Sequence, residues 1–160
     1  NRVSIEKRPK VVEYKKRVGD FEIDTVIQTR AKNECLLTLT DRKSRYQIIR
    51  LIPDKSAFSV NQALKAILKD YQMNSITADN GAEFSRLAEV FDPTHIYYAH
   101  PYSSWERGTN ENHNRLIRRW LPKGSKNATQ QQVAFIENWI NNYPKKLFNY
   151  KSPKEFLQTG

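Results

Sequence analysis

The chain has 160 residues, enough for one domain with a hydrophobic core but too few for two domains of ordinary size. Its 27 lysine and arginine residues outnumber 17 acidic ones, and the net charge of +10 favours a polyanionic partner, nucleic acid first, over a merely basic surface. No apolar run approaches the ~20 residues of a membrane span, and the single cysteine, Cys35, excludes an internal disulfide and fits a reducing cytoplasm.

The first 18 residues are polar and basic, and they precede the first clear hydrophobic alternation. We interpret residues 1–18 as an arm or linker and residues 19–160 as one core domain. The arm could contact a DNA backbone or could be a solvated tether, and its composition does not decide between the two.

Three strands are predicted next, joined by short polar connections. Apolar and polar side chains alternate over residues 21–27, and strand-like apolar runs follow at 35–40 and 46–52. Short connections of this kind favour antiparallel hairpins.

Helices and strands alternate in the rest of the chain. Ser56 and Thr129 are suitable N-caps for two helices with apolar side chains at helical spacing. The other predicted elements are a strand at 75–78, a short helix at 84–91, a strand at 96–99, and helices at 109–121 and from Ser152 onward. The order β-β-β-α-β-α-β-α indicates an α/β protein with a mixed five-stranded sheet and helices on both faces, which is the order of the ribonuclease H-like fold.

Three carboxylates in short polar signatures are candidates for one metal site. Asp24 lies in the first strand, Asp79 at the end of the fourth strand, and Glu111 in the first turn of a helix. An acid on a central strand needs a cation or a partner, and strand ends commonly carry sites. The helix dipole alone can account for Glu111. Other nearby acids and a histidine are rivals or local partners: Asp20, Glu22, Asp41, Glu83 and His113.

The helix of Glu111 has two different faces. Asn114, Arg115 and Arg118 share the face of Glu111, which suits a metal ligand flanked by phosphate contacts. A Glu–Arg pair at this spacing is also a common source of ~0.2–0.5 kcal/mol of helix stability. On the opposite side, Trp120 and its apolar neighbours are expected to pack on the sheet.

Several motifs in this chain resemble those of known transposases. Residues 79–84 (DNGAEF) and 108–114 (GTNENHN) resemble the second-acid and third-acid motifs of retroviral-type integrases and related transposases, and the 31 residues between Asp79 and Glu111 match their usual spacing. Further segments resemble the IS30-family transposases more narrowly: 19–26 (GDFEIDTV), 40–45 (TDRKSR), 100–112 (HPYSSWERGTNEN), 141–146 (NNYPKK) and 150–156 (YKSPKEF). The resemblance does not include that family's amino-terminal helix-turn-helix region, so it is to the catalytic core alone.

This resemblance implies a DDE transposase core, a magnesium-dependent polynucleotidyl transferase. Asp24, Asp79 and Glu111 would bind two Mg²⁺ or Mn²⁺ ions, and the motif selects Asp24 over its acidic neighbours. DNA would be hydrolysed at a transposon end, and the released 3′-OH would then attack a target phosphodiester. Candidate DNA contacts are the polar, basic and aromatic residues around the acids: Asn80, Trp105, Arg107, Asn114, Arg115, Arg118 and Lys123.

The implied partners are double-stranded DNA, as transposon ends and target, and a second copy of the chain, because two ends are joined. The implied location is the bacterial cytoplasm, at the nucleoid when the protein is on DNA, with no membrane partner. Two alternatives remain open. One is a ribonuclease H-like nuclease without strand transfer, and the other is a non-catalytic module that binds nucleic acid through its basic face.

Overall fold

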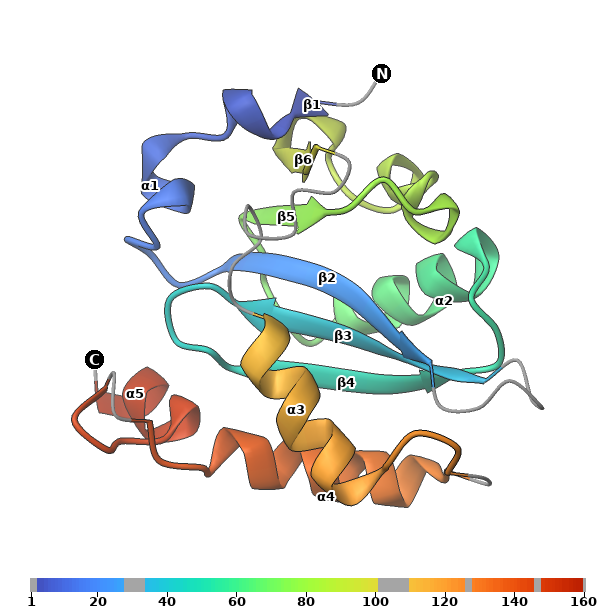
Figure 1. Ribbon diagram of the computed structural model, residues 1–160. Coiled ribbons are helices and arrows are strands. Elements are labelled where there is room, and N and C mark those ends of the chain that lie inside the picture. The colour runs from blue at the N-terminus through green and yellow to red at the C-terminus, as the bar shows by residue number, and fades with distance from the viewer. Residues whose placement is uncertain (1–2, 28–33, 101–109, 126–127, 146–147, 160) are drawn as a thin grey trace.

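The computed structural model describes residues 3–27, 34–100, 110–125, 128–145 and 148–159, with only the backbone described at 27, 110–112 and 159. In this part of the chain one mixed sheet has six strands: β1 (Val3–Ser4), β2 (Asp20–Ile27), β3 (Cys35–Asp41), β4 (Gln47–Ile52), β5 (Ser75–Ala78) and β6 (Ile96–Tyr98). Their spatial order is β1-β6-β5-β2-β3-β4 (Figure 1). The β2–β3 and β3–β4 pairs are antiparallel, as predicted, and the other pairs are parallel.

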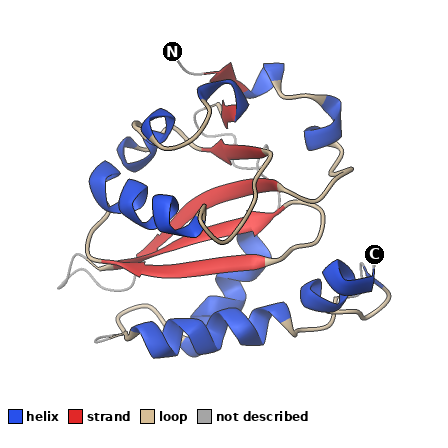
Figure 2. Cartoon of the chain, turned by 180° about the vertical axis from the view of Figure 1, so that it is seen from behind, coloured by secondary structure: helices blue, strands red, loops and turns tan. Residues whose placement is uncertain are grey.

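Helices cover both faces of the sheet, as the opposite views of Figures 1 and 2 show. On one face lies α2 (Ala57–Ile67), and on the other lie α3 (Asn110–Trp120) and α4 (Gln130–Asn141). The other described helices are short: α1 (Lys10–Glu13), α5 (Pro153–Thr159), and the 3-10 turns η1 (Ile5–Lys7), η2 (Ala82–Phe84), η3 (Leu87–Glu89) and η4 (Pro93–His95). None of these described helices is long and apolar enough to cross a membrane.

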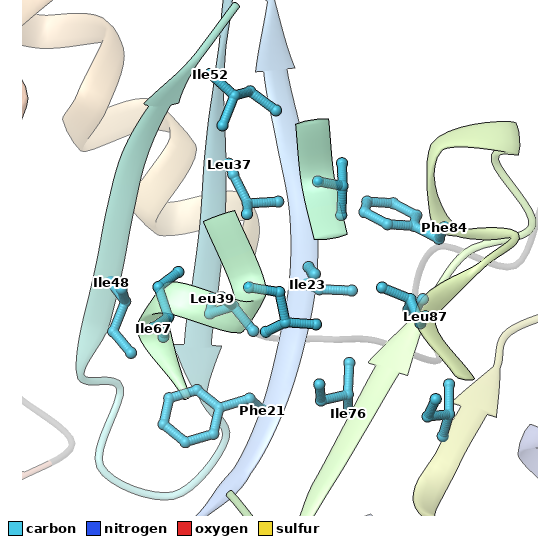
Figure 3. Close-up of a cluster of buried hydrophobic side chains, with 14 of the residues drawn as sticks. Phe21, Ile23, Leu37, Leu39, Ile48, Ile52, Ile67, Ile76, Phe84 and Leu87 are labelled. Carbon is cyan, nitrogen blue, oxygen red and sulfur yellow. The ribbon is translucent and has the colours of Figure 1, made fainter. Parts of the chain in front are cut away.

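Two hydrophobic clusters hold the layers together, one on each face. The first lies between the sheet and α2, where Ile23 of β2 packs with Ile67 of α2 and Phe84 of η2 (Figure 3). The second joins the sheet to α3 and α4, and includes Val26 of β2 and Ile117 of α3. Because strand side chains alternate, β2 supplies residues to both clusters, which fixes which face each polar residue of β2 occupies.

The predicted starts of the two longest helices are confirmed. The Ser56 side chain accepts a hydrogen bond from the backbone N–H of Ser59 at the start of α2. At the start of α4, Thr129 and Gln132 form a reciprocal capping box. Both caps satisfy N–H groups that a helix leaves without an internal partner.

The predicted helix at 84–91 is wrong in type. The chain there forms η2 and η3, two separate 3-10 turns. Each turn buries one apolar side chain in the core, Phe84 from η2 and Leu87 from η3. These two anchors are enough to hold the segment on the core without a longer α-helix.

The amino-terminal segment packs on the core from Val3 onward. β1 pairs in parallel with β6 and supplies the sixth strand, which the sequence did not predict. Val12 is fully buried, and the Arg42 side chain donates hydrogen bonds to the carbonyl oxygens of Val12 and Glu13. The segment is thus part of the folded unit, although the domain boundary at residue 18 stays a prediction.

Candidate active site

The parallel pairing of β2 with β5 sets where two of the predicted acids lie along the sheet. Glu22 pairs with Thr77 as the last pair of this ladder, and Asp24 and Asp79 each lie two residues further along. Asp24 is still within β2, whereas Asp79 directly follows the last residue of β5. Since Val26 packs against α3 and α4, Asp24, two residues before it, lies on the sheet face that these helices cover.

Both carboxylates are half-buried and each accepts a hydrogen bond from a backbone N–H close by in the chain. Asp24 Oδ1 accepts from the N–H of Thr25 at 2.8 Å, and Asp79 Oδ1 accepts from the N–H of Gly81 at 2.7 Å. The second bond forms an Asx turn at the point where β5 has ended. Each bond restrains the rotation of its carboxylate and helps to orient it toward a ligand.

The third predicted acid belongs to the start of α3. Glu111 is the second residue of this helix, and its side chain lies outside the part of the chain that the structure describes. α3 contacts β2, and Leu116 and Ile117 anchor it on the face that carries Asp24. Figure 1 shows its amino-terminal end toward β2 and its other end over α4. That all three carboxylates meet stays a prediction.

Two of the rival acids are buried in ion pairs. Asp20 is fully buried, pairs with Arg17 at 2.8 Å and accepts a hydrogen bond from the Ser75 hydroxyl at 2.7 Å. Glu22 is also fully buried, and its carboxylate pairs with the buried guanidinium of Arg42. Both acids share the face of Asp24, but their partners give them a role in holding the fold together.

The third rival, Asp41, organises the turn between β3 and β4. Its carboxylate accepts hydrogen bonds from the backbone N–H groups of Gly19, Lys43 and Ser44 at 2.8–2.9 Å. Burial raises the pKa of Asp41, and these N–H bonds act in the opposite direction. A carboxylate with three such donors holds two connections in place, and its oxygens are committed to that task.

The described acids fit a divalent cation as an incomplete set. Carboxylate oxygens are the ligands that Mg²⁺ and Mn²⁺ prefer, and Asp24 and Asp79 supply two such groups, each two residues beyond the last β2–β5 pair. Within the described side chains, no three His, Cys, Asp or Glu residues could together hold a metal ion. The pair therefore needs a further ligand, and Glu111 is the predicted one.

The predicted DNA contacts nearest the acids have different environments. Asn80 is exposed, and its side-chain amide donates to the carbonyl oxygen of Ala99, which ties the ends of β5 and β6 together. On α3, Arg115 is exposed, whereas Arg118 is half-buried and burial lowers the pKa of its guanidinium. The Oδ1 atom of Asn114 is buried without a hydrogen-bond partner among the described residues.

Three further predicted DNA contacts lie in the connections on either side of α3. Lys123 is exposed in the connection that follows this helix. Trp105 and Arg107 precede the helix and lie outside the residues that the structure describes. A role in DNA binding therefore stays a prediction for all three.

The expected packing of Trp120 on the sheet is wrong. This side chain is 40% exposed, and its ring meets those of Phe135 and Trp139 on α4 edge-on, with centroids 5.1 and 5.4 Å apart. Arg119 lies over the Trp139 ring, 5.6 Å from its centroid. Trp120 therefore joins α3 to α4, while the sheet contacts of α3 come from its smaller apolar side chains.

Basic side chains gather beside the amino-terminal half of α3. Burial, and then the nearby charges of Arg45 and Arg115, lower the pKa of Lys145 to about 8. Burial, Lys145 and Arg45 likewise lower the pKa of the almost fully buried His113 to about 3. Positive charges held together in this way favour the binding of an anion such as a phosphate backbone. Arg45 and Lys145 are not among the predicted DNA contacts, although both lie in the IS30-like motifs.

Proteins of similar sequence are transposases of insertion sequences, although no protein-family model matches. The chain is 41% identical over 158 residues to the probable transposase for insertion-like sequence element IS1161 of Streptococcus salivarius, covering 97% of the chain and 46% of that protein. It is 42% identical over 160 residues to the transposase for insertion sequence element IS4351 of Bacteroides fragilis, covering 96% and 49%. It is 38% identical over 167 residues to transposase InsI for insertion sequence element IS30C of Escherichia coli (strain K12), covering 100% and 43%. The chain belongs to the IS30-family transposases.

This IS30-family chain spans about half the length of the curated relatives it matches. Among solved structures it is similar to the catalytic core domain of BIV integrase, with a TM-score of 0.67 and 16% sequence identity, over 86% of this chain and 92% of that one. At this identity the likeness shows the fold. The predicted ribonuclease H-like class is confirmed, with six strands in place of five.

Proposed function

We propose that this chain is the catalytic core of a DDE transposase, which cuts the 3′ ends of an insertion sequence and joins them to target DNA. The observation that carries the proposal is the parallel register of β2 and β5, because Asp24 and Asp79 each lie two residues beyond its last pair, and Asp24 is on the face covered by α3. Membership of the IS30-family transposases supports the choice of DNA joining among the reactions that such acids could serve.

In this proposal Asp24, Asp79 and Glu111 hold Mg²⁺ or Mn²⁺, with two ions in the active complex. Bound divalent cations would supply Lewis acidity that activates the nucleophile and stabilises the leaving 3′ oxygen. The backbone N–H groups of Thr25 and Gly81 orient the two aspartates. The carboxylates need no covalent bond to DNA, because water is the nucleophile in cleavage and the 3′-OH is the nucleophile in joining.

Phosphate binding falls to the basic residues around the start of α3. Arg115 and Arg118 lie on the helix that carries Glu111, and Lys145 lies close to both Arg115 and Arg45. Their guanidinium and ammonium groups would hold the DNA backbone on the same side of the sheet as the acids. Because two ends are joined, the active complex would be a homodimer or larger assembly on double-stranded DNA, in the bacterial cytoplasm.

A strand-transfer assay tests this function. The chain is mixed with Mg²⁺, a target plasmid and an oligonucleotide duplex that carries a pre-cut 3′-OH transposon end, and joined product is resolved on a gel. We expect joining by the wild type and none by Asp24→Asn, Asp79→Asn or Glu111→Gln, while each variant still binds DNA. Nicking without joined product would instead indicate a nuclease, and undiminished function of the variants would indicate a non-catalytic nucleic-acid-binding module.

A further inference from the structure

A fourth acid, Glu83, contacts residues that are close in the chain to both Asp24 and Asp79. It belongs to η2, four residues after Asp79, and is 6% exposed. Its Oε2 atom accepts a hydrogen bond from the Thr25 hydroxyl at 3.0 Å and pairs with the Lys55 ammonium at 3.2 Å. Thr25 directly follows Asp24, so a single carboxylate connects the neighbourhood of one predicted catalytic acid to that of the other.

The other oxygen of Glu83 lies against the turn that orients Asp79. A Cβ atom placed on Gly81 would lie 2.0 Å from Glu83 Oε1 and 2.9 Å from Asp79 Oδ1. The two carboxylates therefore pack against the same α-carbon, and only glycine leaves room for both. The N–H of Gly81 donates to Asp79 Oδ1, so any shift of Glu83 acts directly on the turn that holds the Asp79 side chain.

Backbone hydrogen bonds of the described β2–β5 ladder do not join Asp24 to Asp79. The described pairing of β2 with β5 ends at Glu22 and Thr77, one alternation before Asp24 and Asp79. The Thr25–Glu83–Gly81 connection begins where this ladder ends. The Glu83 end of this connection is anchored by the next residue, Phe84, which is fully buried in the cluster between the sheet and α2 (Figure 3). The carbonyl oxygen of Phe84 also accepts a hydrogen bond from the Tyr98 hydroxyl at 2.6 Å.

Lys55 supplies a cation beside this buried carboxylate. Its ammonium group lies 3.2 Å from Glu83 Oε2 and holds that oxygen by charge attraction. Lys55 comes from the connection before α2, and its side chain is 47% exposed, so the pair contributes little to stability by itself. Its main effect is to restrain the position of the Glu83 carboxylate.

We propose that Glu83, held by Lys55, is a positioning residue that sets the separation of Asp24 and Asp79 and so the affinity of their site for a divalent cation. The proposal rests on the function proposed above for these two acids. Glu83 acts through Thr25 and Gly81 and is not itself a ligand of the cation. Its effect is comparable to that of the outer partners of metal ligands in general, whose loss weakens metal binding about 10–100-fold.

The test is direct Mn²⁺ binding to the whole chain, followed by calorimetry or by the electron paramagnetic resonance signal of free Mn²⁺. We expect Glu83→Gln and Thr25→Val each to weaken Mn²⁺ binding about 10–100-fold with almost unchanged thermal midpoints. Lys55→Met should have a smaller effect in the same direction. The double variant Thr25→Val/Glu83→Gln should be no weaker than the poorer single variant, because both remove one connection.

Glu89→Gln is the matched control, since Glu89 lies on the next 3-10 turn and pairs with Arg86 at the surface. Wild-type affinity in both Glu83→Gln and Thr25→Val would overturn the proposal. So would a Glu83→Gln variant that binds as poorly as Asp79→Asn while Thr25→Val binds normally, because Glu83 would then be a direct ligand. Mn²⁺ affinity that follows the variants while no DNA is joined would contradict the transposase function alone.

Discussion

The two ends of the β2–β5 pair hold acids of the same type in different ways. At the amino-terminal end, Asp20 and Glu22 are fully buried and paired with Arg17 and Arg42. At the carboxyl-terminal end, Asp24 is half-buried and accepts a backbone N–H bond from its neighbour. A buried acid with its own arginine is committed to the fold, since a metal ion could bind it only by displacing that cation. Asp24, mid-strand and beyond the part of β2 that pairs with β5, is half-buried, and we propose that its carboxylate binds a ligand.

Residue spacing alone does not distinguish Asp24 from Asp20 and Glu22, but their partners do. Asp20, Glu22 and Asp24 alternate along one face of β2, so periodicity treats them alike. Their difference comes from partners on other segments, namely Arg17 in the amino-terminal segment and Arg42 in the β3–β4 turn. Substitutions at the carboxyl-terminal end of the β2–β5 pair should therefore affect catalysis and metal binding, whereas those at the amino-terminal end should affect stability.

The largest expected effect is on DNA cleavage at the carboxyl-terminal end. Asp24→Asn should lower Mg²⁺-dependent cleavage by about 10³-fold or more, because several kcal/mol of metal-assisted transition-state stabilisation would be lost and each 1.36 kcal/mol is tenfold in rate. Urea unfolding should change little. The exposed acid Asp70, changed to Asn, is the control that should keep full activity. Near-normal cleavage by Asp24→Asn would remove Asp24 from the site.

Next in size is an effect on stability at the amino-terminal end. Arg42→Met leaves the fully buried Glu22 without its cation and should cost about 3–5 kcal/mol of unfolding free energy. Urea denaturation measures this cost. The double variant Arg42→Met/Glu22→Gln should recover part of it, since the buried Glu22 charge is then removed as well. If Arg42→Met were as mild as Arg86→Met, which breaks a surface pair, the structural role of Glu22 would be wrong.

A smaller effect is expected from the metal ion itself. Mn²⁺ at 100 times its dissociation constant should raise the unfolding free energy by about 2.7 kcal/mol, because it binds the folded state alone. The gain should disappear with EDTA and in Asp79→Asn, but persist in Asp70→Asn. Thermal unfolding with and without Mn²⁺ provides the measurement. Equal stabilisation of wild type and Asp79→Asn would place the ion somewhere other than the carboxyl-terminal end.

The smallest effect concerns the basic region beside α3. Lys145 has a folded-state pKa of about 8 against an ordinary value of 10.5, so at neutral pH its charge costs stability. Lys145→Met should therefore be more stable than wild type at pH 7, by up to about 1 kcal/mol once solvent screening is allowed for. Between pH 8 and 10.5 the folded wild type releases this proton before the unfolded chain does. Its stability should then rise toward that of the variant.

Urea denaturation of both proteins at pH 7 and at pH 9.5 shows whether the gap closes. The exposed Lys69, changed to Met, is the matched control and should show no such closing gap. A Lys145→Met variant that is less stable than wild type at pH 7 would mean that Lys145 is held by favourable contacts and not strained by its basic neighbours.

Local patterns in the sequence predict much of this fold. The N-caps Ser56 and Thr129, the strand at 75–78 and the antiparallel order of the first hairpins all follow from residues close together in the chain. β1 could not be predicted in this way, because a strand of two residues has no periodicity and depends on its pairing with β6. The exposed packing of Trp120 depends on α4 and is equally invisible to a helical pattern.

In the candidate site, too, some residues could be predicted from local motifs, whereas others depend on contacts between distant segments. The motifs select Asp24, Asp79 and Glu111, and the register of β2 and β5 supports the first two. The environment of Glu83 could not be derived from the sequence, since Thr25 and Lys55 come from different segments of the chain. Such contacts between distant segments decide which acids hold the fold, which position a site, and which face a ligand.

The most direct test of this account is a crystal of the whole chain soaked in Mn²⁺, with the ion located by its anomalous scattering. The account predicts Mn²⁺ bound by the carboxylates of Asp24 and Asp79, with Glu111 reaching the same ion or a second one beside it. Mn²⁺ bound instead by Asp20, Glu22 or Asp41 would contradict the separation of tasks between the two ends of the strand pair.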